Sequence, residues 1–96
     1  MSYKILWSKL AIQKIKDIVD YISIDNPVNA KIFAQNLFVK THRLSEFPKS
    51  ERIVPELNQE KLREIVYSNY RIIYRIENQN IHILTVRNSR EFINFE

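Results

Sequence analysis

The chain of 96 residues contains no cysteine, no glycine and only 3 prolines. The absence of cysteine excludes disulfide bonds, thiolate metal sites and a cysteine nucleophile, and it fits a protein of the reducing cytoplasm. Without glycine, each turn that requires a positive φ must use another residue, and we expect asparagine there. No apolar run approaches the ~18 residues of a membrane span, and the chain turns polar at Ser8, before a signal-peptide core could form. We therefore expect a soluble, unprocessed, cytoplasmic protein.

The length and the charge of the chain indicate how many domains it has and what kind of partner it binds. The chain is long enough for one compact domain and too short for two of ordinary size, so we expect a single domain over residues 1–96. With 15 Lys and Arg against 11 Asp and Glu, the net charge of +4 favours acidic partners. From Arg63 to Arg90 all five basic residues are arginines, whose planar fork suits phosphate or carboxylate. We expect the recognition surface in this segment.

The first half of the chain predicts a strand followed by two helices. Residues 2–7 include β-branched and aromatic side chains, and Ser8 can cap the helix that apolar spacing predicts to about residue 24. Asn26 and Pro27 end that helix and begin a second one, with Asn26 as its N-cap. The second helix is predicted to run to about Phe47. The short turn between the two implies an antiparallel helix hairpin.

The second half predicts a sheet. Residues 62–67, 70–77 and 81–87 are rich in Ile, Val and Tyr, and short polar turns separate them into two hairpins. The polar loop at 48–61 contains one short extended piece around Ile53. The predicted fold is α+β, in the order β-α-α-β-β-β, with the antiparallel helix hairpin packed on one face of a mainly antiparallel sheet.

The central strand, 70–77, predicts two different faces. Its even-numbered positions up to 76 are Tyr or Ile and belong under the helices, whereas Arg71 and Arg75 lie on the other, uncovered face. That face is the predicted binding surface, although the two arginines can instead pair with Glu64 and Glu77. The place of Arg87 stays open. A turn of two residues at 78–79 puts it on the helix side, and a turn of three residues without a bulge puts it beside Arg71.

Four segments in fixed order resemble the pattern of the RelE/ParE superfamily, the toxins of type II toxin–antitoxin systems, also known as plasmid stabilisation proteins. They are RIVPEL (52–57), LREI (62–65), NYRIIYRI (69–76) and ILTVRNSR (83–90), and the preceding strand, helix hairpin and Phe47-Pro48 match as well. The resemblance covers essentially the whole chain. It implies the predicted fold and a cognate acidic antitoxin as partner. It leaves the target open, since ParE-like members poison DNA gyrase and RelE-like members cleave messenger RNA on the ribosome.

RNA cleavage requires a base for the ribose 2′-hydroxyl, an acid for the leaving oxygen, and cations for the phosphorane. By the resemblance, Arg71 matches the arginine that contacts the scissile phosphate, and Arg90 lies near the arginine after the last strand. Glu64 is the candidate base, with Glu56 as a second. The histidine often found after the last strand is Asn88 here, and asparagine does not transfer protons near neutral pH.

The C-terminal tyrosine of several RNA-cleaving members is also missing, because Phe92 and Phe95 stand in that region. This incomplete set favours a ParE-like toxin that binds gyrase. A RelE-like ribosome-dependent endoribonuclease is the alternative, and a non-toxic interaction module of the same fold is the second. The predicted contacts to target and antitoxin are Arg63, Arg71, Arg75, Arg87, Arg90, Phe92 and Phe95. We expect no membrane partner, no cofactor and no metal, because His42 and His82 lack neighbours at ligand spacing.

Overall fold

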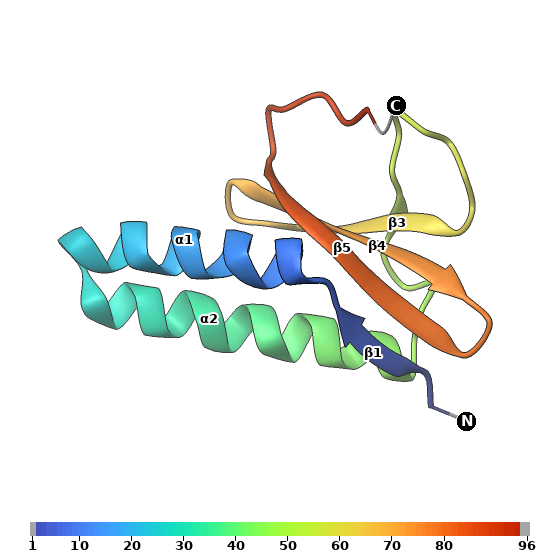
Figure 1. Ribbon diagram of the computed structural model, residues 1–96, viewed down its shortest axis with the longest axis horizontal. Helices are drawn as coiled ribbons and strands as arrows, with labels where there is room; N and C mark the ends of the chain where they lie inside the picture. Colours follow the sequence, from blue (N-terminus) through green and yellow to red (C-terminus); the bar gives the residue numbers. More distant parts are fainter. Residues whose placement is uncertain (1, 95–96) are drawn as a thin grey trace.

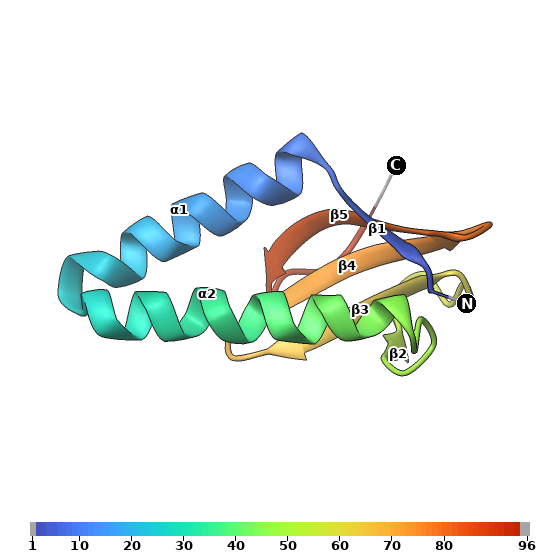
Figure 2. The same ribbon diagram turned by 90° about the horizontal axis from the view of Figure 1, so that it is seen from below.

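The computed structural model describes residues 2–94. In chain order the elements are β1 (Lys4–Trp7), α1 (Lys9–Asp25), α2 (Pro27–His42), the 3₁₀ turn η1 (Arg43–Ser45), β2 (Arg52–Ile53), β3 (Leu62–Tyr67), β4 (Tyr70–Glu77) and β5 (Asn80–Asn88). The strands form one sheet of order β1-β5-β4-β3-β2, in which β1 and β5 are parallel and the other neighbours are antiparallel. The helix hairpin covers one face of this sheet, and its turn projects beyond the strands (Figures 1 and 2). The predicted α+β fold is confirmed.

Both helices begin where the sequence predicts. The hydroxyl of Ser8 accepts a hydrogen bond from the Ala11 amide at 2.9 Å, and the side chain of Asn26 accepts one from the Asn29 amide at 3.0 Å. The predicted end of the second helix at Phe47 is wrong. α2 stops at His42, where the backbone tightens into η1, a common way to satisfy the last carbonyls of a helix.

The helix-facing side of the sheet holds the main core. Strand register brings Ile65, Ile72 and Val86 into one row across β3, β4 and β5, and all three are buried. Leu37 and Phe33 of α2 pack against this row from above. The even-numbered positions of β4 therefore lie beneath the helices, as predicted.

A bulge in β5 decides on which face Arg87 lies. The turn between β4 and β5 contains two residues, because Glu77 pairs with Asn80, but the register shifts between Ile73 and Tyr74. The extra residue on β5 is Leu84, and beyond it the alternation of faces is reversed, so that Arg87 pairs with Arg71. The prediction that a two-residue turn places Arg87 on the helix side is wrong, since it allowed for no bulge.

The turns use asparagine in place of glycine at two of three positions. Among the described residues, Asn58 and Asn78 adopt positive φ angles of 50° and 56°, and Ser68 adopts 56°. Asparagine was expected at each of these, so Ser68 is the exception. The backbone carbonyl of the neighbouring Asn69 accepts a 2.7 Å hydrogen bond from the Ser89 amide.

The other face of the sheet is partly covered, contrary to the prediction of an open surface. Val54 from the loop after β2 and Ile93 from the segment after β5 pack on Ile73 of β4, and all three are buried. Leu57 and Leu84 pack at the edge of this second cluster. Local alternation could not predict this cover, because both covering segments lie outside the regular strands.

Replacing Ile72 by alanine should lower the free energy of unfolding by roughly 2 to 5 kcal/mol, because the side chain is fully buried in the main core. The matched control is Ile24→Ala near the tip of the hairpin, where the isoleucine is 80% exposed and a change within about 0.5 kcal/mol is expected. Urea unfolding of both variants measures the difference. Equal losses would contradict the assignment of the core to the helix-facing side.

Candidate functional site

Arg71 lies at the centre of a buried cluster of charges. Its Nε donates to Glu64 Oε1 at 2.7 Å, and its Nη1 and Nη2 donate to the two carboxylate oxygens of Glu56 at 2.5 and 2.6 Å. The Nη1 group also donates to the carbonyl of Glu91 at 3.1 Å. On the far side, Arg52 Nε donates to Glu64 Oε2 at 2.6 Å. We call Arg52, Glu56, Glu64 and Arg71 the ion cluster.

Strand register explains how these residues meet. Glu64 on β3 stands opposite Arg52 on β2 and opposite Ile73 on β4, so that Arg71 is its diagonal neighbour. Glu56 comes from the loop after β2 and approaches Arg71 on the sheet face opposite the helices. Its Oε2 also accepts a 3.1 Å hydrogen bond from the Ile93 amide, which joins the segment after β5 to the cluster.

The electrostatics of the cluster favour permanent charges. The hydrogen bonds from Arg71 lower the pKa of Glu56 to about 2, against the opposing effect of burial and with help from the Ile93 amide. The hydrogen bonds to Glu56, and then those to Glu64, raise the pKa of Arg71 above its ordinary value. A carboxylate and a guanidinium held in these states are poor proton carriers near neutral pH.

The predicted exposure of Arg71 is therefore wrong, and the alternative, a pair with Glu64 across the strands, is confirmed. Only 4% of Arg71 is accessible, and Glu64 is fully buried. The chain brings one of its two phosphate-contacting candidates, Arg71, together with the candidate base Glu64, but in a closed arrangement. Arg90, the other candidate, lies exposed in the turn after β5 and outside this cluster.

The remaining predicted contacts are scattered. Arg63 pairs in register with Tyr74 on the helix side, and its guanidinium donates to the carbonyls of Glu60 and Glu51 at 3.0 and 2.8 Å. Arg75 stays half-buried on the opposite face, 3.6 Å from Glu77 on its own strand. Arg63 thus tethers the preceding loop from the helix side of the sheet, and its contact with target or antitoxin stays a prediction.

The segment after β5 contains one residue that the sequence analysis missed. Phe92 is exposed, as a contact residue would be, and Phe95 lies outside the described residues. Ile93 between them is fully buried and anchors the segment on Ile73. The sequence offered no distinct signal for Ile93, since it stands beside Phe92 and close to Phe95, which are equally apolar.

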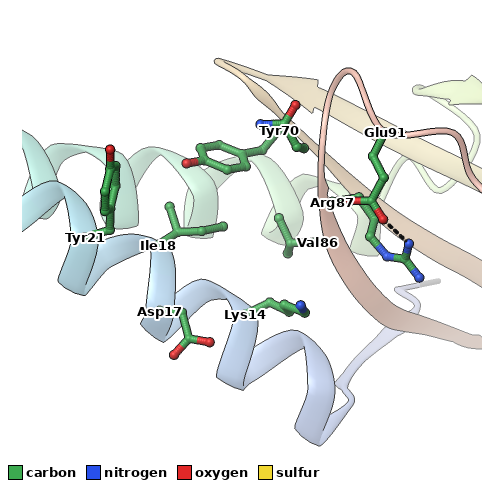
Figure 3. A pocket seen from close by; sticks show the side chains of 9 residues that line it. Lys14, Asp17, Ile18, Tyr21, Tyr70, Val86, Arg87 and Glu91 are labelled. Atoms are coloured by element: carbon green, nitrogen blue, oxygen red, sulfur yellow. Dashed lines mark hydrogen bonds and ion pairs between the residues drawn. The ribbon is translucent and has the colours of Figure 1, made fainter.

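A cleft lies between α1 and the end of β5 (Figure 3). Arg87 forms an ion pair with Glu91 at its rim, while Lys14 and Asp17 approach from α1. Tyr70 lies between the two layers. Because charges of both signs line the cleft, it has no clear preference for an anion or a cation.

An apolar groove that the sequence analysis also missed is formed by β1, α1 and α2. Trp7, Ile12 and Phe38 line it, together with Ile15, Ala34 and Leu37. Ile12 and Phe38 are 55% and 64% exposed. Their positions off the inner stripe of each helix were the signal for a second apolar surface. We call these six residues the helix groove.

Within residues 2–94, no group of three or more His, Asp or Glu side chains is placed to hold a metal ion. Neither helix there combines the length and the apolar character needed to cross a bilayer.

The ion cluster predicts how stability depends on pH. The folded protein holds the pKa of Glu56 near 2 instead of its ordinary 4.5, so the stabilisation is complete above 4.5 and is lost as the pH falls toward 2. We expect a loss on the order of 2 to 3 kcal/mol over that window. In Glu56→Gln the loss should be much smaller, because glutamine does not titrate.

Urea unfolding at neutral pH and at several acidic pH values tests this. The matched control is Glu46→Gln, which changes an exposed glutamate outside the ion cluster and should keep the pH dependence of the natural chain. The same acid-induced loss in Glu56→Gln as in the natural chain would show that other carboxylates cause it.

The comparisons with known proteins agree with this architecture. The model of the family described as "ParE toxin of type II toxin-antitoxin system, parDE" matches residues 5–92. In fold, the chain is similar to a chain of the chromosomal ParDE system from P. aeruginosa, with a TM-score of 0.73 and 17% identity over 91% of this chain and 96% of that one. It is also similar to a chain of the RelBE2 toxin–antitoxin complex from Mycobacterium tuberculosis, with a TM-score of 0.58 and 18% identity over 92% and 99% of the two chains.

No curated protein matches the chain significantly. The two structural likenesses concern the fold alone, since both fall below 25% identity. The family match, by contrast, extends over nearly the whole length. The chain therefore belongs to the ParE toxin family of type II toxin–antitoxin systems.

Proposed function

We propose that this type II toxin arrests growth by binding DNA gyrase, as the resemblance to ParE-like members implies, and that a cognate acidic antitoxin neutralises it. The observation that carries the proposal is the saturation of Arg71. Its Nε and both terminal nitrogens donate to Glu64, Glu56 and the Glu91 carbonyl. A guanidinium engaged in this way has little capacity left for a scissile phosphate.

The candidates for proton transfer support the same conclusion. Glu64 accepts hydrogen bonds from Arg52 and Arg71 and is withdrawn from solvent, so a ribose hydroxyl has no path to it. The lowered pKa of Glu56 makes it a weak base. Asn88 and Phe92 stand where the RNA-cleaving members use groups that transfer protons. Binding a protein target requires none of these steps.

The helix groove supports the antitoxin part of the proposal. Its lining is almost wholly apolar, and an amphipathic helix of a partner fits such a surface. Lys9 and Lys16 lie one helical turn from Ile12, and Lys31 lies one turn from Ala34, so bases surround the groove. We infer that the antitoxin lays an apolar stripe flanked by carboxylates into it. This replaces the expected contact with all five arginines, of which Arg71 is inaccessible.

Induced expression without antitoxin should stop growth and switch on the DNA-damage response, while translation continues at first. The purified protein should block supercoiling of relaxed plasmid by purified gyrase. The matched control is Ile72→Asp, which places a charge in the core and prevents folding. Prompt cleavage of ribosome-bound transcripts with undamaged DNA would instead support the RelE-like alternative. Normal growth with high levels of folded protein would support the interaction module.

Replacing Phe38 by serine should weaken neutralisation by the antitoxin about tenfold or more while growth inhibition stays unchanged, because the groove loses an exposed apolar anchor. The matched control is Phe47→Ser, which removes a phenylalanine of similar exposure, 56%, outside the groove. Titration of each variant with the co-expressed and purified antitoxin measures the dissociation constant. Equal affinities of both variants would place the antitoxin elsewhere.

A further inference from the structure

We propose that a hollow between Arg75 and Arg87, on the sheet face opposite the helices, binds a segment of the target protein that presents a carboxylate next to an apolar side chain. The hollow has a volume of about 510 Å³. Its lining consists of the two arginines, Leu10, Gln59, Leu62, Leu84 and Thr85. The inference rests on the proposed function, since it assumes that the target is a protein.

Two hydrogen-bonding groups at this hollow lack partners. Arg75 Nε and Thr85 Oγ1 are both buried, and within residues 2–94 neither forms a hydrogen bond. The carboxylate of Glu77 lies 3.6 Å from Arg75 Nε, which is too far for one. Both groups can donate a hydrogen bond, so an acceptor in the hollow would give each of them a partner. The half-buried side chains around the two groups must move apart to let it enter.

The bulge at Leu84 creates this arrangement. Before the bulge, β5 places Ile81 and Ile83 toward the helices. After it, Thr85 and Arg87 lie on the opposite face, in register with Ile73 and Arg71. Because Arg71 is closed off by the ion cluster, Arg75 and Arg87 are the cations of this face that line an open cavity in the described chain.

The surroundings favour a peptide carboxylate over a nucleic acid. Three of the seven lining residues are leucines, from α1, β3 and β5, and leucine offers no flat surface on which a base can stack. Glu77 and Glu91 pair with Arg75 and Arg87, so each arginine already has a carboxylate partner, the group that a bound peptide segment would offer in its place.

The hollow and the helix groove share no lining residue, which allows their functions to be separated. Arg75→Gln combined with Arg87→Gln should reduce growth inhibition about tenfold, measured as the inducer level that halves the growth rate, because the segment loses its charge partners. Binding of the antitoxin and the melting temperature should stay close to those of the natural chain. The matched control is the exposed Arg43→Gln on η1, which should keep full toxicity.

Thr85→Val distinguishes a binding role from a structural one. The change keeps the shape and removes a buried hydroxyl without a partner, so the melting temperature should stay or rise. If the hydroxyl binds the target, growth inhibition falls even though the melting temperature does not. The matched control is Thr41→Val, which removes a buried hydroxyl that donates to the Phe38 carbonyl and should lower stability but not toxicity. Full toxicity of both Thr85→Val and the double arginine variant would overturn the proposal.

Titrations followed by NMR identify the ligand class directly. The probes are the blocked peptide acetyl-Leu-Glu-Leu-Glu-Leu-amide, its glutamine counterpart and a uridine hexanucleotide. We expect the glutamate peptide to shift the Thr85 amide and Arg75 side-chain signals saturably, with affinity about tenfold above that of the glutamine peptide. Preferential binding of the hexanucleotide, or no binding of the glutamate peptide, would overturn the proposal. If the variants lose toxicity but the natural chain has no effect on gyrase, gyrase is not the target. The proposal that the hollow binds a segment of the target then still stands.

Discussion

The burial of one positive charge organises this protein. A guanidinium withdrawn from water is very unfavourable unless ionised partners surround it with good geometry, and Arg71 has two of them in Glu56 and Glu64. Meeting that requirement fixes the loop after β2, which carries Glu56, and the segment after β5, whose Ile93 amide donates to the same carboxylate. These two segments then close part of the sheet face that the alternation of β4 leaves open.

The charge balance of the cluster has a consequence for recognition. Its two arginines and two glutamates cancel, so the net charge of +4 resides entirely on groups outside it. Some of that charge lies on the lysines around the helix groove. At the hollow, by contrast, Arg75 and Arg87 pair with Glu77 and Glu91, so a carboxylate of a partner binds there by displacing these pairs. Long-range attraction of an acidic partner is therefore expected at the helix groove, and exchange of ion pairs at the hollow.

The start of α1 and the bulge in β5 stabilise one another. Ser8 caps the helix, and its hydroxyl donates to the Leu84 carbonyl at 2.7 Å while its amide donates to the Ile83 carbonyl at 3.0 Å. The bond to Ile83 continues the pairing of β1 with β5, and the bond to Leu84 satisfies the carbonyl of the bulge residue. The start of the helix and the bulge are thus joined through Ser8.

The sequence by itself determined the elements, their order, the caps at Ser8 and Asn26, the inner core face of β4 and the resemblance to the toxin superfamily. Each of these depends on spacing within a short segment or on motifs in fixed order, which a single chain displays directly. Only the tertiary structure decided that Arg71 is buried, that Arg87 shares its face, and that β1 and the two helices form an apolar groove. The physical reason is distance along the chain. Glu56 reaches Arg71 from a loop without periodicity, and the amide of Ile93, in the segment after β5, donates to Glu56. The bulge residue Leu84 accepts a hydrogen bond from Ser8, which lies 76 residues away.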